Sequence, residues 1–190
     1  MASQRAAWVL KQAGLHPDHL VFLDETGAKT NMIRLYGRSP QGKRLVEKVP
    51  HGHWKSTTFL AALRSTGLTA PMVMDGAITG PHFLAYLKQI LVPTLQPGDV
   101  VVMDNLPAHK VAGVKEIVAK AGAQVLYLPP YSPDLNPIEL AFSKLKWLLR
   151  SAKERDVEKL WKTCGELLDR FTAEECRNYL RHCGYRATVM

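Results

Sequence analysis

Two short apolar runs, each ending in an aspartate, constrain the fold of this chain more than any other feature. Residues 20–23 (LVFL) lead directly into Asp24, and residues 100–103 (VVVM) lead directly into Asp104. Apolar runs of this length, closed by polar residues, are typical of buried strands. If the two strands are parallel neighbours, about 4.8 Å apart, both carboxylates lie side by side at one sheet edge.

Three more strands and six helices complete the predicted pattern. We predict strands at 56–63, 70–74 and 125–128, and helices at 4–13, 81–91, 112–121, from 137 or 138 onward, 156–170 and 173–182. The order places an antiparallel half before a parallel half, as in a mixed α/β sheet covered by helices. Thr172, with Glu175 three residues later, has the spacing of a helix-capping box.

Length, composition and charge narrow the class of protein. The 190 residues suit one domain, and 46% hydrophobic with 22% charged residues excludes general disorder. No apolar run approaches the roughly 20 residues of a membrane helix, and no signal peptide is apparent, so a cytoplasmic protein is expected. The net charge of +8 favours a nucleic-acid partner. Cys164, Cys176 and Cys183 are expected to be reduced structural thiols rather than zinc ligands.

Residues 28–53 form a basic excursion with little regular core. Five glycines and prolines interrupt it, and a loop of this length inside a compact domain is usually functional or disordered. Its candidate DNA-binding residues are Arg34, Arg38, Lys43 and Arg44. Trp54, at the end of the excursion, could stack on a base, although packing beneath the sheet is favoured.

A third acid, Glu139, begins the helix that follows the proline-rich loop 129–137. Asn136 is a natural N-cap for that helix. If the helix packs across the same sheet edge, Glu139 joins Asp24 and Asp104 around one or two hard cations, and Mg²⁺ prefers such carboxylates. Each acid also has an ordinary structural explanation, as a turn former or as a partner of the helix dipole.

Three segments together resemble the catalytic domain of DDE transposases, in the mariner-like superfamily and its bacterial insertion-sequence branch. They are FLDET (22–26), MDNLPAHK (103–110) and LPPYSPDLNPIE (128–139). The 34 residues between Asp104 and Glu139 match the spacing of that group. The similarity extends from about His16 to Tyr185.

The resemblance implies an RNase H-like fold, in which three antiparallel strands precede two parallel ones. It implies Asp24, Asp104 and Glu139 as the catalytic, metal-binding triad, with two Mg²⁺ or Mn²⁺ ions when DNA is bound. Residues 1–150 would form the catalytic domain, with 28–53 as an insertion that contacts DNA or a second subunit. Residues 151–190 would be a helical extension of the same domain.

Several other residues are weaker candidates at the same site. His109 and Lys110 could contact a DNA phosphate, or could be ordinary loop residues. Asn105 could orient Asp104 through a hydrogen bond, or could serve only as a turn former. On the helix of Glu139, Lys146 and Arg150 share one face that could follow the DNA backbone or could be a solvated surface.

The implied function is DNA strand cleavage and strand transfer for an insertion sequence. Relatives carry N-terminal helix-turn-helix domains, for which this chain has no room before Leu20, so such a region is expected in cis or in trans. A homodimer on DNA is also expected, bound to transposon ends and target. The rival interpretation is a non-catalytic DNA-binding or assembly module, or an inhibitor derived from a truncated transposase. A related structure-selective nuclease is disfavoured by the loop before Glu139.

Within that loop, Asp134 is a second acid close to the predicted triad. We expect Glu139 to be the metal ligand, because it lies in a helical turn where packing fixes its side chain. Asp134 is expected to accept backbone N–H bonds and hold the shape of the loop.

Overall fold

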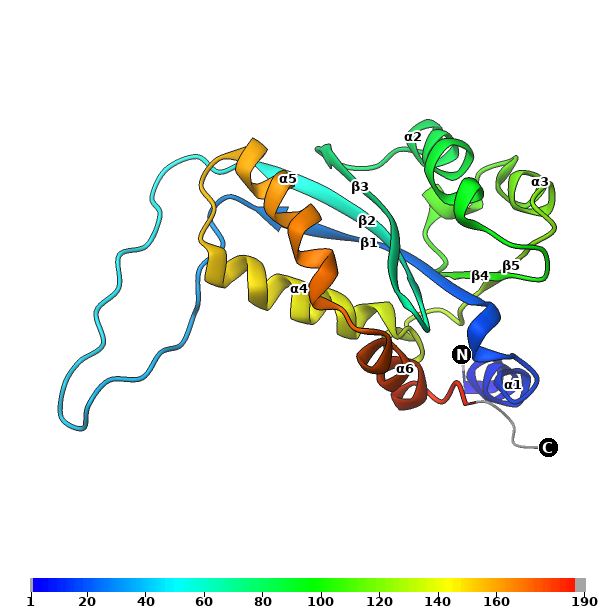
Figure 1. Ribbon diagram of the computed structural model, residues 1–190, viewed down its shortest axis with the longest axis horizontal. Coiled ribbons are helices and arrows are strands. Elements are labelled where there is room, and N and C mark those ends of the chain that lie inside the picture. The colour runs from blue at the N-terminus through cyan, green and yellow to red at the C-terminus, as the bar shows by residue number, and fades with distance from the viewer. Residues whose placement is uncertain (1, 187–190) are drawn as a thin grey trace.

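One mixed sheet of five strands forms the centre of the molecule. The strands are β1 (Leu20–Lys29), β2 (Ser56–Arg64), β3 (Gly67–Asp75), β4 (Val100–Met103) and β5 (Gln124–Tyr127). In the computed structural model, which describes residues 2–186, their order across the sheet is β3-β2-β1-β4-β5 (Figure 1). Strands β1, β2 and β3 pair antiparallel, whereas β4 pairs parallel with both β1 and β5. The predicted mixed sheet is therefore confirmed.

Helices cover both faces of this sheet. They are α1 (Ala2–Gln12), α2 (Gly80–Tyr86), α3 (Val114–Ala119), α4 (Ile138–Ala152), α5 (Val157–Glu166) and α6 (Ala173–His182). The predicted helix 81–91 continues beyond α2 as a π-helical turn and then a 3₁₀ turn that ends at Thr94. Figure 1 shows α4 and α5 along one side of the sheet, with α2 and α3 on the other.

Alternation along the strands divides the core into two layers. Phe22 and Val102 pack with Phe142 of α4 on one face. Leu23 and Val101 pack with residues of α2 and α3 on the other face. Since side chains alternate along a strand, residues two positions apart face the same layer. Any residue two positions after Phe22 or Val102 therefore points toward α4.

Strand β1 is longer than predicted and carries Asp24 in its middle. The expected strand ends at residue 23, but pairing with β2 continues as far as Lys29 opposite Ser56. Thr26 and Ala28 are buried on this added stretch, and Gly27 and Lys29 are exposed. This alternation, typical of a strand with one covered face, explains why an apolar run alone underestimated its length.

The basic excursion begins after β1, so residues 30–55 lie outside regular elements and the predicted range 28–53 starts too early. Figure 1 shows it as a long arm that projects from the molecule beside the connection between α4 and α5. Arg155 holds the base of the arm: its Nη1 donates to the carbonyl oxygens of Thr30 at 2.9 Å and Met32 at 3.0 Å. Lys153 also forms an ion pair with Glu47 on the returning side of the arm, and residues 34–49 are exposed.

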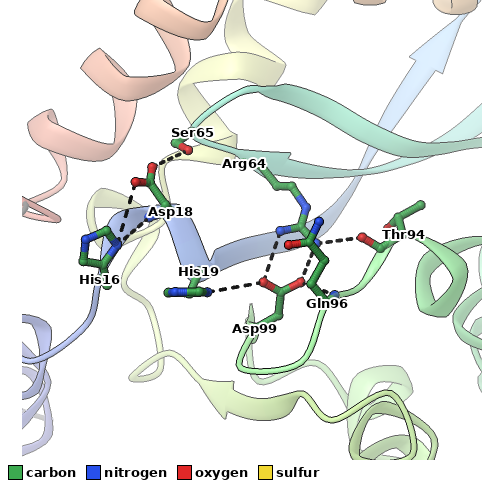
Figure 2. A network of polar contacts seen from close by, with 8 residues as sticks. All are labelled: His16, Asp18, His19, Arg64, Ser65, Thr94, Gln96 and Asp99. Atoms are coloured by element: carbon green, nitrogen blue, oxygen red, sulfur yellow. Dashed lines mark hydrogen bonds and ion pairs between the residues drawn. The ribbon is translucent and has the colours of Figure 1, made fainter.

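A buried ion pair fastens the opposite end of the sheet. Arg64, at the end of β2, donates through Nη2 to Asp99 Oδ2 at 2.6 Å and to the Thr94 carbonyl at 2.9 Å. Asp99 also accepts from the Gln96 backbone N–H at 2.8 Å, and His19 lies 3.9 Å away (Figure 2). This network ties the β2–β3 hairpin to the segment that leads into β4.

The core shows no break at residue 150. Helix α4 extends past that position to Ala152, and Leu160 of α5 and Leu180 of α6 join the same buried cluster as α4. The division into 1–150 and 151–190 stays a prediction.

The thiols of all three cysteines are free and buried, and burial raises their pKa to about 11. Within residues 2–186, none of the helices has the length and apolarity to cross a bilayer.

Candidate active site

Asp24 and Asp104 occupy equivalent positions on neighbouring parallel strands. The register pairs Leu20 with Val100 and Phe22 with Val102. Asp24 lies two residues after Phe22, and Asp104 lies two residues after Val102. Both side chains therefore point toward α4. They line the same cavity, of about 530 Å³, whose other walls come from the loop 128–133 and the start of α4.

Glu139 reaches this cavity from the first turn of α4. The helix packs on the sheet through Ile138, Phe142 and Leu145, which are buried at the spacing of one helical face. Glu139 lies beside that buried stripe, is exposed, and lines the cavity together with Asp24 and Asp104. Three acids that are far apart in the sequence thus line one cavity.

Asp24 is almost fully buried, with 6% of its surface exposed. Its Oδ1 accepts the backbone N–H of Glu25 and its Oδ2 accepts the Nδ2 of Asn136, both at 2.8 Å. Burial raises the pKa of Asp24 to about 7, and the negative charges of Asp104, Glu25 and Glu139 add to that increase. The protein therefore holds a carboxylate in a place where its charge is unfavourable without a cation.

Asp104 is more open and is held differently. Its Oδ1 accepts the backbone N–H of Leu106 at 3.0 Å and lies 2.7 Å from Nδ1 of His109. Partial burial opposes ionisation, but the hydrogen bonds from His109 and Leu106 outweigh it and hold the pKa of Asp104 below its usual value. The pKa of Asp104 is therefore lower than that of Asp24.

The structure corrects the predicted position of His109. The side chain is fully buried, so it has no surface with which to contact a DNA phosphate. Its Nε2 lies 2.9 Å from Oε2 of Glu25, and its ring packs on Phe83 with centroids 4.5 Å apart. Burial disfavours the charged imidazole, but the hydrogen bonds to Asp104 and Glu25 prevail and raise the pKa of His109 to about 9.

Neither asparagine makes the contact predicted for it. Asn105 does not bond to Asp104; its Nδ2 donates to the carbonyl of Leu128 and ties β4 to the end of β5. Asn136 does not cap α4 with its side chain, since the N-cap position belongs to Pro137 and lacks a side-chain bond. Asn136 instead orients Asp24, and its Oδ1 is buried without a partner among the described residues.

Helix α1 and the C-terminal segment brace the loop before Glu139. Arg5 donates to both carboxylate oxygens of Asp134, at 2.9 and 2.6 Å, and to Oγ of Ser132 at 2.8 Å. The hydroxyl of Tyr185 donates to the carbonyl of Leu135 at 2.8 Å. Asp134 does hold the loop, as predicted, but through Arg5 rather than mainly through backbone N–H groups.

The remaining basic candidates are spread over three regions. Lys110 lines the cavity, and its Nζ lies 5.6 Å from the ring centroid of Tyr127. Lys146 and Arg150 are half-buried on α4 and are not among the cavity residues. Arg34 donates to Oγ of Ser151 at the base of the arm.

Further along the arm, Arg38, Lys43 and Arg44 are exposed. Trp54 has 55% of its surface exposed, so its predicted packing beneath the sheet is wrong. Met32 at the base of the arm packs against the core, whereas the apolar residues farther along the arm, Leu35, Leu45, Val46 and Val49, are exposed. These cations and aromatic side chains therefore remain available at the surface.

The acids form an open site rather than a closed cage. Among residues 2–186, no three His, Cys, Asp or Glu side chains converge closely enough to enclose a metal ion. Mg²⁺ commonly binds one or two carboxylates and completes its shell with waters and substrate phosphates. An open arrangement of carboxylates at a cavity therefore fits such an ion, whereas it would not fit a structural zinc ion.

Comparison with protein families identifies the family of this chain. A family described as DDE superfamily endonuclease matches residues 19–161, which is more than half of the chain and includes Asp24, Asp104 and Glu139. The chain belongs to this family. The DDE superfamily endonuclease match covers the entire sheet and α4, together with the first half of α5. No curated protein matches the sequence.

Solved structures of Mos1 transposase have the same RNase H-like fold as this DDE superfamily endonuclease. A Mos1 mariner paired-end complex with Mn has a TM-score of 0.76 at 16% identity, covering 96% of this chain and 57% of that chain. A pre-cleavage Mos1 transpososome has a TM-score of 0.74 at 16% identity, covering 95% and 56%. The Mos1 catalytic domain with raltegravir and Mg has a TM-score of 0.71 at 15% identity, covering 96% and 87%. The chain thus spans little more than half of the Mos1 chains in the DNA complexes.

Proposed function

We propose that this DDE superfamily endonuclease is a transposase catalytic domain that cleaves DNA strands and transfers them to a target with the help of divalent cations. The observation that carries the proposal is the meeting of Asp24, Asp104 and Glu139 at one cavity, from three separate elements. Carboxylates placed in this way are the protein ligands of metal-assisted phosphoryl transfer. The proposed reaction needs no covalent bond between protein and DNA.

The donor set of the cavity suits Mg²⁺ or Mn²⁺. All three acids offer hard oxygen ligands, and the buried Oδ1 of Asn136 has no partner among the described residues. Asp24 and Asp104 would share the ions, and Glu139 would hold the second. When bound, two such cations supply the charge that activates the attacking oxygen and stabilises the leaving oxygen.

The other cavity residues have supporting tasks. Asn136 and His109 hold the two aspartates, so these carboxylates need not reorganise when DNA arrives. Lys110 is the basic residue on the lining, and its ammonium group can bind a phosphate next to the scissile one. The loop braced by Arg5 fixes the start of α4 and thereby the place of Glu139.

We further propose where this chain acts and which partners it needs. We place the chain in the bacterial insertion-sequence branch, acting in the cytoplasm on nucleoid DNA as a homodimer assembled on transposon ends. A helix-turn-helix region, in cis or in trans, would supply recognition of the ends. The net charge of +8 supports a DNA partner, and the similar Mos1 structures include a paired-end complex with a transposon end and a strand-transfer complex.

A metal-dependent cleavage assay tests the proposal, with labelled terminal-repeat DNA, Mg²⁺ or Mn²⁺, and a helix-turn-helix polypeptide supplied in trans. Glu139→Gln should reduce strand cleavage by about 10²-fold or more, because it removes a charge needed in the transition state. Glu158→Gln is the matched control, since Glu158 also lies in the first turn of a helix, α5, but away from the cavity.

Three outcomes would contradict the proposed enzyme. They are cleavage that persists in a chelator, equal activity of the two glutamine variants, and DNA binding without cleavage under any metal. The last outcome would favour the rival interpretation, a DNA-binding or assembly module.

A further inference from the structure

His109 joins two carboxylates from different parts of the fold. Its Nδ1 lies 2.7 Å from Oδ1 of Asp104, and its Nε2 lies 2.9 Å from Oε2 of Glu25, 84 residues away in the sequence. The His109 side chain is 0% exposed, whereas those of Glu25 and Asp104 are 17% and 35% exposed. Both ring nitrogens are therefore engaged inside the protein, on the side of Asp104 that faces away from solvent.

The imidazole is fixed on several sides besides these two contacts. Its ring packs against Phe83 at a centroid distance of 4.5 Å. The carbonyl of His109 accepts the hydroxyl of Tyr127 at 2.8 Å, and its backbone N–H donates to the carbonyl of Leu106 at 3.0 Å. Because backbone and ring are both held, the histidine can act as a rigid support.

This support acts on a residue that the sheet alone does not hold. Asp104 follows Met103, the last paired residue of β4. Its Oδ1 accepts from both Leu106 and His109, and no described residue donates to its Oδ2. The contacts therefore fix the rotation of the carboxylate and leave one oxygen free for a cation.

Glu25 is the anchor of this arrangement rather than a fourth acid of the cavity. It follows Asp24 on β1, and alternation along the strand directs it to the opposite face of the sheet. Accordingly, Asp24 lines the cavity and Glu25 does not. The role open to Glu25 is to hold the far nitrogen of His109 in place.

We propose that His109 is a positioning residue, which holds Asp104 so that its free carboxylate oxygen is ready to bind a cation, with Glu25 as the anchor. The inference rests on the proposed function, because a cation must use Asp104. It predicts that metal affinity falls more when the hydrogen bond from His109 to Asp104 is lost than when the one to Glu25 is lost. Loss of the partner that orients a metal ligand typically costs about 10–100-fold in metal affinity or activity.

Two substitutions separate the two contacts of His109. In His109→Asn, the side-chain nitrogen takes the place of Nδ1 and can still donate to Asp104. In His109→Gln, the longer side chain places its nitrogen near the position of Nε2, where it can reach Glu25 but not Asp104. Both variants lose the ring packing on Phe83, so a merely structural role for His109 would affect them similarly.

The experiment titrates Mn²⁺ into the whole chain without DNA, follows free Mn²⁺ by electron paramagnetic resonance, and records the Tm of every variant. We expect His109→Gln to weaken Mn²⁺ binding by about 10-fold or more and His109→Asn to stay within about threefold of wild type. His19→Gln is the matched control, since that half-exposed histidine lies at the opposite end of the sheet (Figure 2).

Glu25→Gln provides a second measurement if a His109 variant fails to fold. It keeps an oxygen that can accept from Nε2 but removes the charge, so Mn²⁺ affinity should fall by several-fold, less than for His109→Gln. Equal Mn²⁺ affinities for wild type, both His109 variants and Glu25→Gln would overturn the positioning role while leaving the proposed function standing. A wild-type chain that binds no Mn²⁺ would overturn this inference, and the absence of metal-dependent cleavage as well would overturn the proposed function.

Discussion

Asn136 donates a hydrogen bond of 2.8 Å to Oδ2 of Asp24 across 112 residues of sequence. The bond joins the loop that leads into α4, the helix of Glu139, to the middle of β1, where Asp24 lies. Asp24 is nearly buried, so its carboxylate has few alternatives to this donor. Removing the donor should therefore affect both the stability of the fold and the placement of the acid.

Asn136→Ala is expected to lower both Tm and the cleavage rate. A hydrogen bond contributes about 0.5–1.5 kcal/mol to a neutral acceptor and up to about 3 kcal/mol to an ionised one, which corresponds to a Tm decrease of roughly 1–12 °C for a protein of this size. Cleavage measured at 20 °C, where the variant is folded, should fall by about 10-fold or more, because Asp24 is no longer held.

The control is Asn105→Ala, because Asn105 also lines the cavity but donates to the Leu128 carbonyl instead of to an acid. It should lose about 1 kcal/mol of stability and much less activity than Asn136→Ala. If the two alanine variants lose cleavage equally, Asn136 has no special relationship with Asp24.

The sheet and the three acids were predictable from the sequence because they depend on local patterns. Apolar runs identified β4 and β5, and the terminal aspartates of two runs identified one edge of the sheet. The length of β1 was underestimated, because residues beyond Asp24 alternate between buried and exposed positions and include Gly27. Their strand conformation depends on pairing with β2, which the run itself does not reveal.

The partners of the acids were not predictable, because they come from contacts between distant segments. Asn136 looked like an N-cap, a role that its local sequence supports, and only the packing of α4 brings it to Asp24. His109 looked like a surface residue because it is polar and follows a turn. The one available signal was Glu25, an acid placed by strand alternation on the buried α2 face, where a buried partner is required.

The ion pair between Arg5 and Asp134 should make stability depend on acid pH. The hydrogen bonds from Arg5 lower the pKa of Asp134 below its ordinary value. The stabilisation is therefore complete above the unfolded pKa of about 3.9 and is lost as the pH falls through the lower folded value. The side chain of Asp134→Asn cannot ionise, so the variant loses the ion pair with Arg5. Its Tm should therefore be slightly lower than that of wild type at pH 7.

The measurement is Tm against pH for wild type and Asp134→Asn in one buffer series. The difference between the two proteins should persist from pH 7 to about 5 and shrink toward pH 3 as Asp134 is protonated. A difference that stays constant down to pH 3 would exclude the ionised form of Asp134 as its cause. Cleavage by Asp134→Asn should remain substantial, since Asp134 is absent from the cavity lining.

The exposed arm should contribute to DNA binding through charge alone. Lys43→Gln with Arg44→Gln removes two exposed cations that make no ion pair with a described residue. Since each neutralised phosphate contributes about 0.9 to the slope of log K against log salt, loss of two contacts should reduce that slope by about 2. Binding to duplex DNA from about 50 to 200 mM salt measures the slope.

The control for the arm removes two exposed lysines elsewhere, Lys88→Gln with Lys120→Gln. Lys88 lies in the π-helical turn that follows α2, and Lys120 caps the C-terminal end of α3, so both belong to the layer opposite α4. This variant should keep the wild-type slope. Equal slopes for both double variants would show that the arm makes no phosphate contact.

The buried pair of Arg64 and Asp99 should govern stability without affecting the chemistry at the other end of the sheet (Figure 2). In Asp99→Asn, the guanidinium stays mostly buried, with 15% of its side chain exposed, and loses its counter-charge. Breaking a buried pair typically costs about 3–5 kcal/mol, so Tm should fall by roughly 6–20 °C. Adding Arg64→Met removes the stranded charge, while the asparagine can still accept the backbone N–H of Gln96.

The double variant should therefore be more stable than Asp99→Asn alone, because its apolar side chain carries no desolvation cost. Cleavage by each variant at 20 °C, corrected for the folded fraction, should stay within about twofold of wild type, since neither residue lines the cavity. A double variant less stable than Asp99→Asn would mean that the bond from Arg64 to the Thr94 carbonyl, not the ion pair, holds this end of the sheet. A large loss of cleavage in a fully folded Asp99→Asn would mean that the two ends of the sheet are coupled.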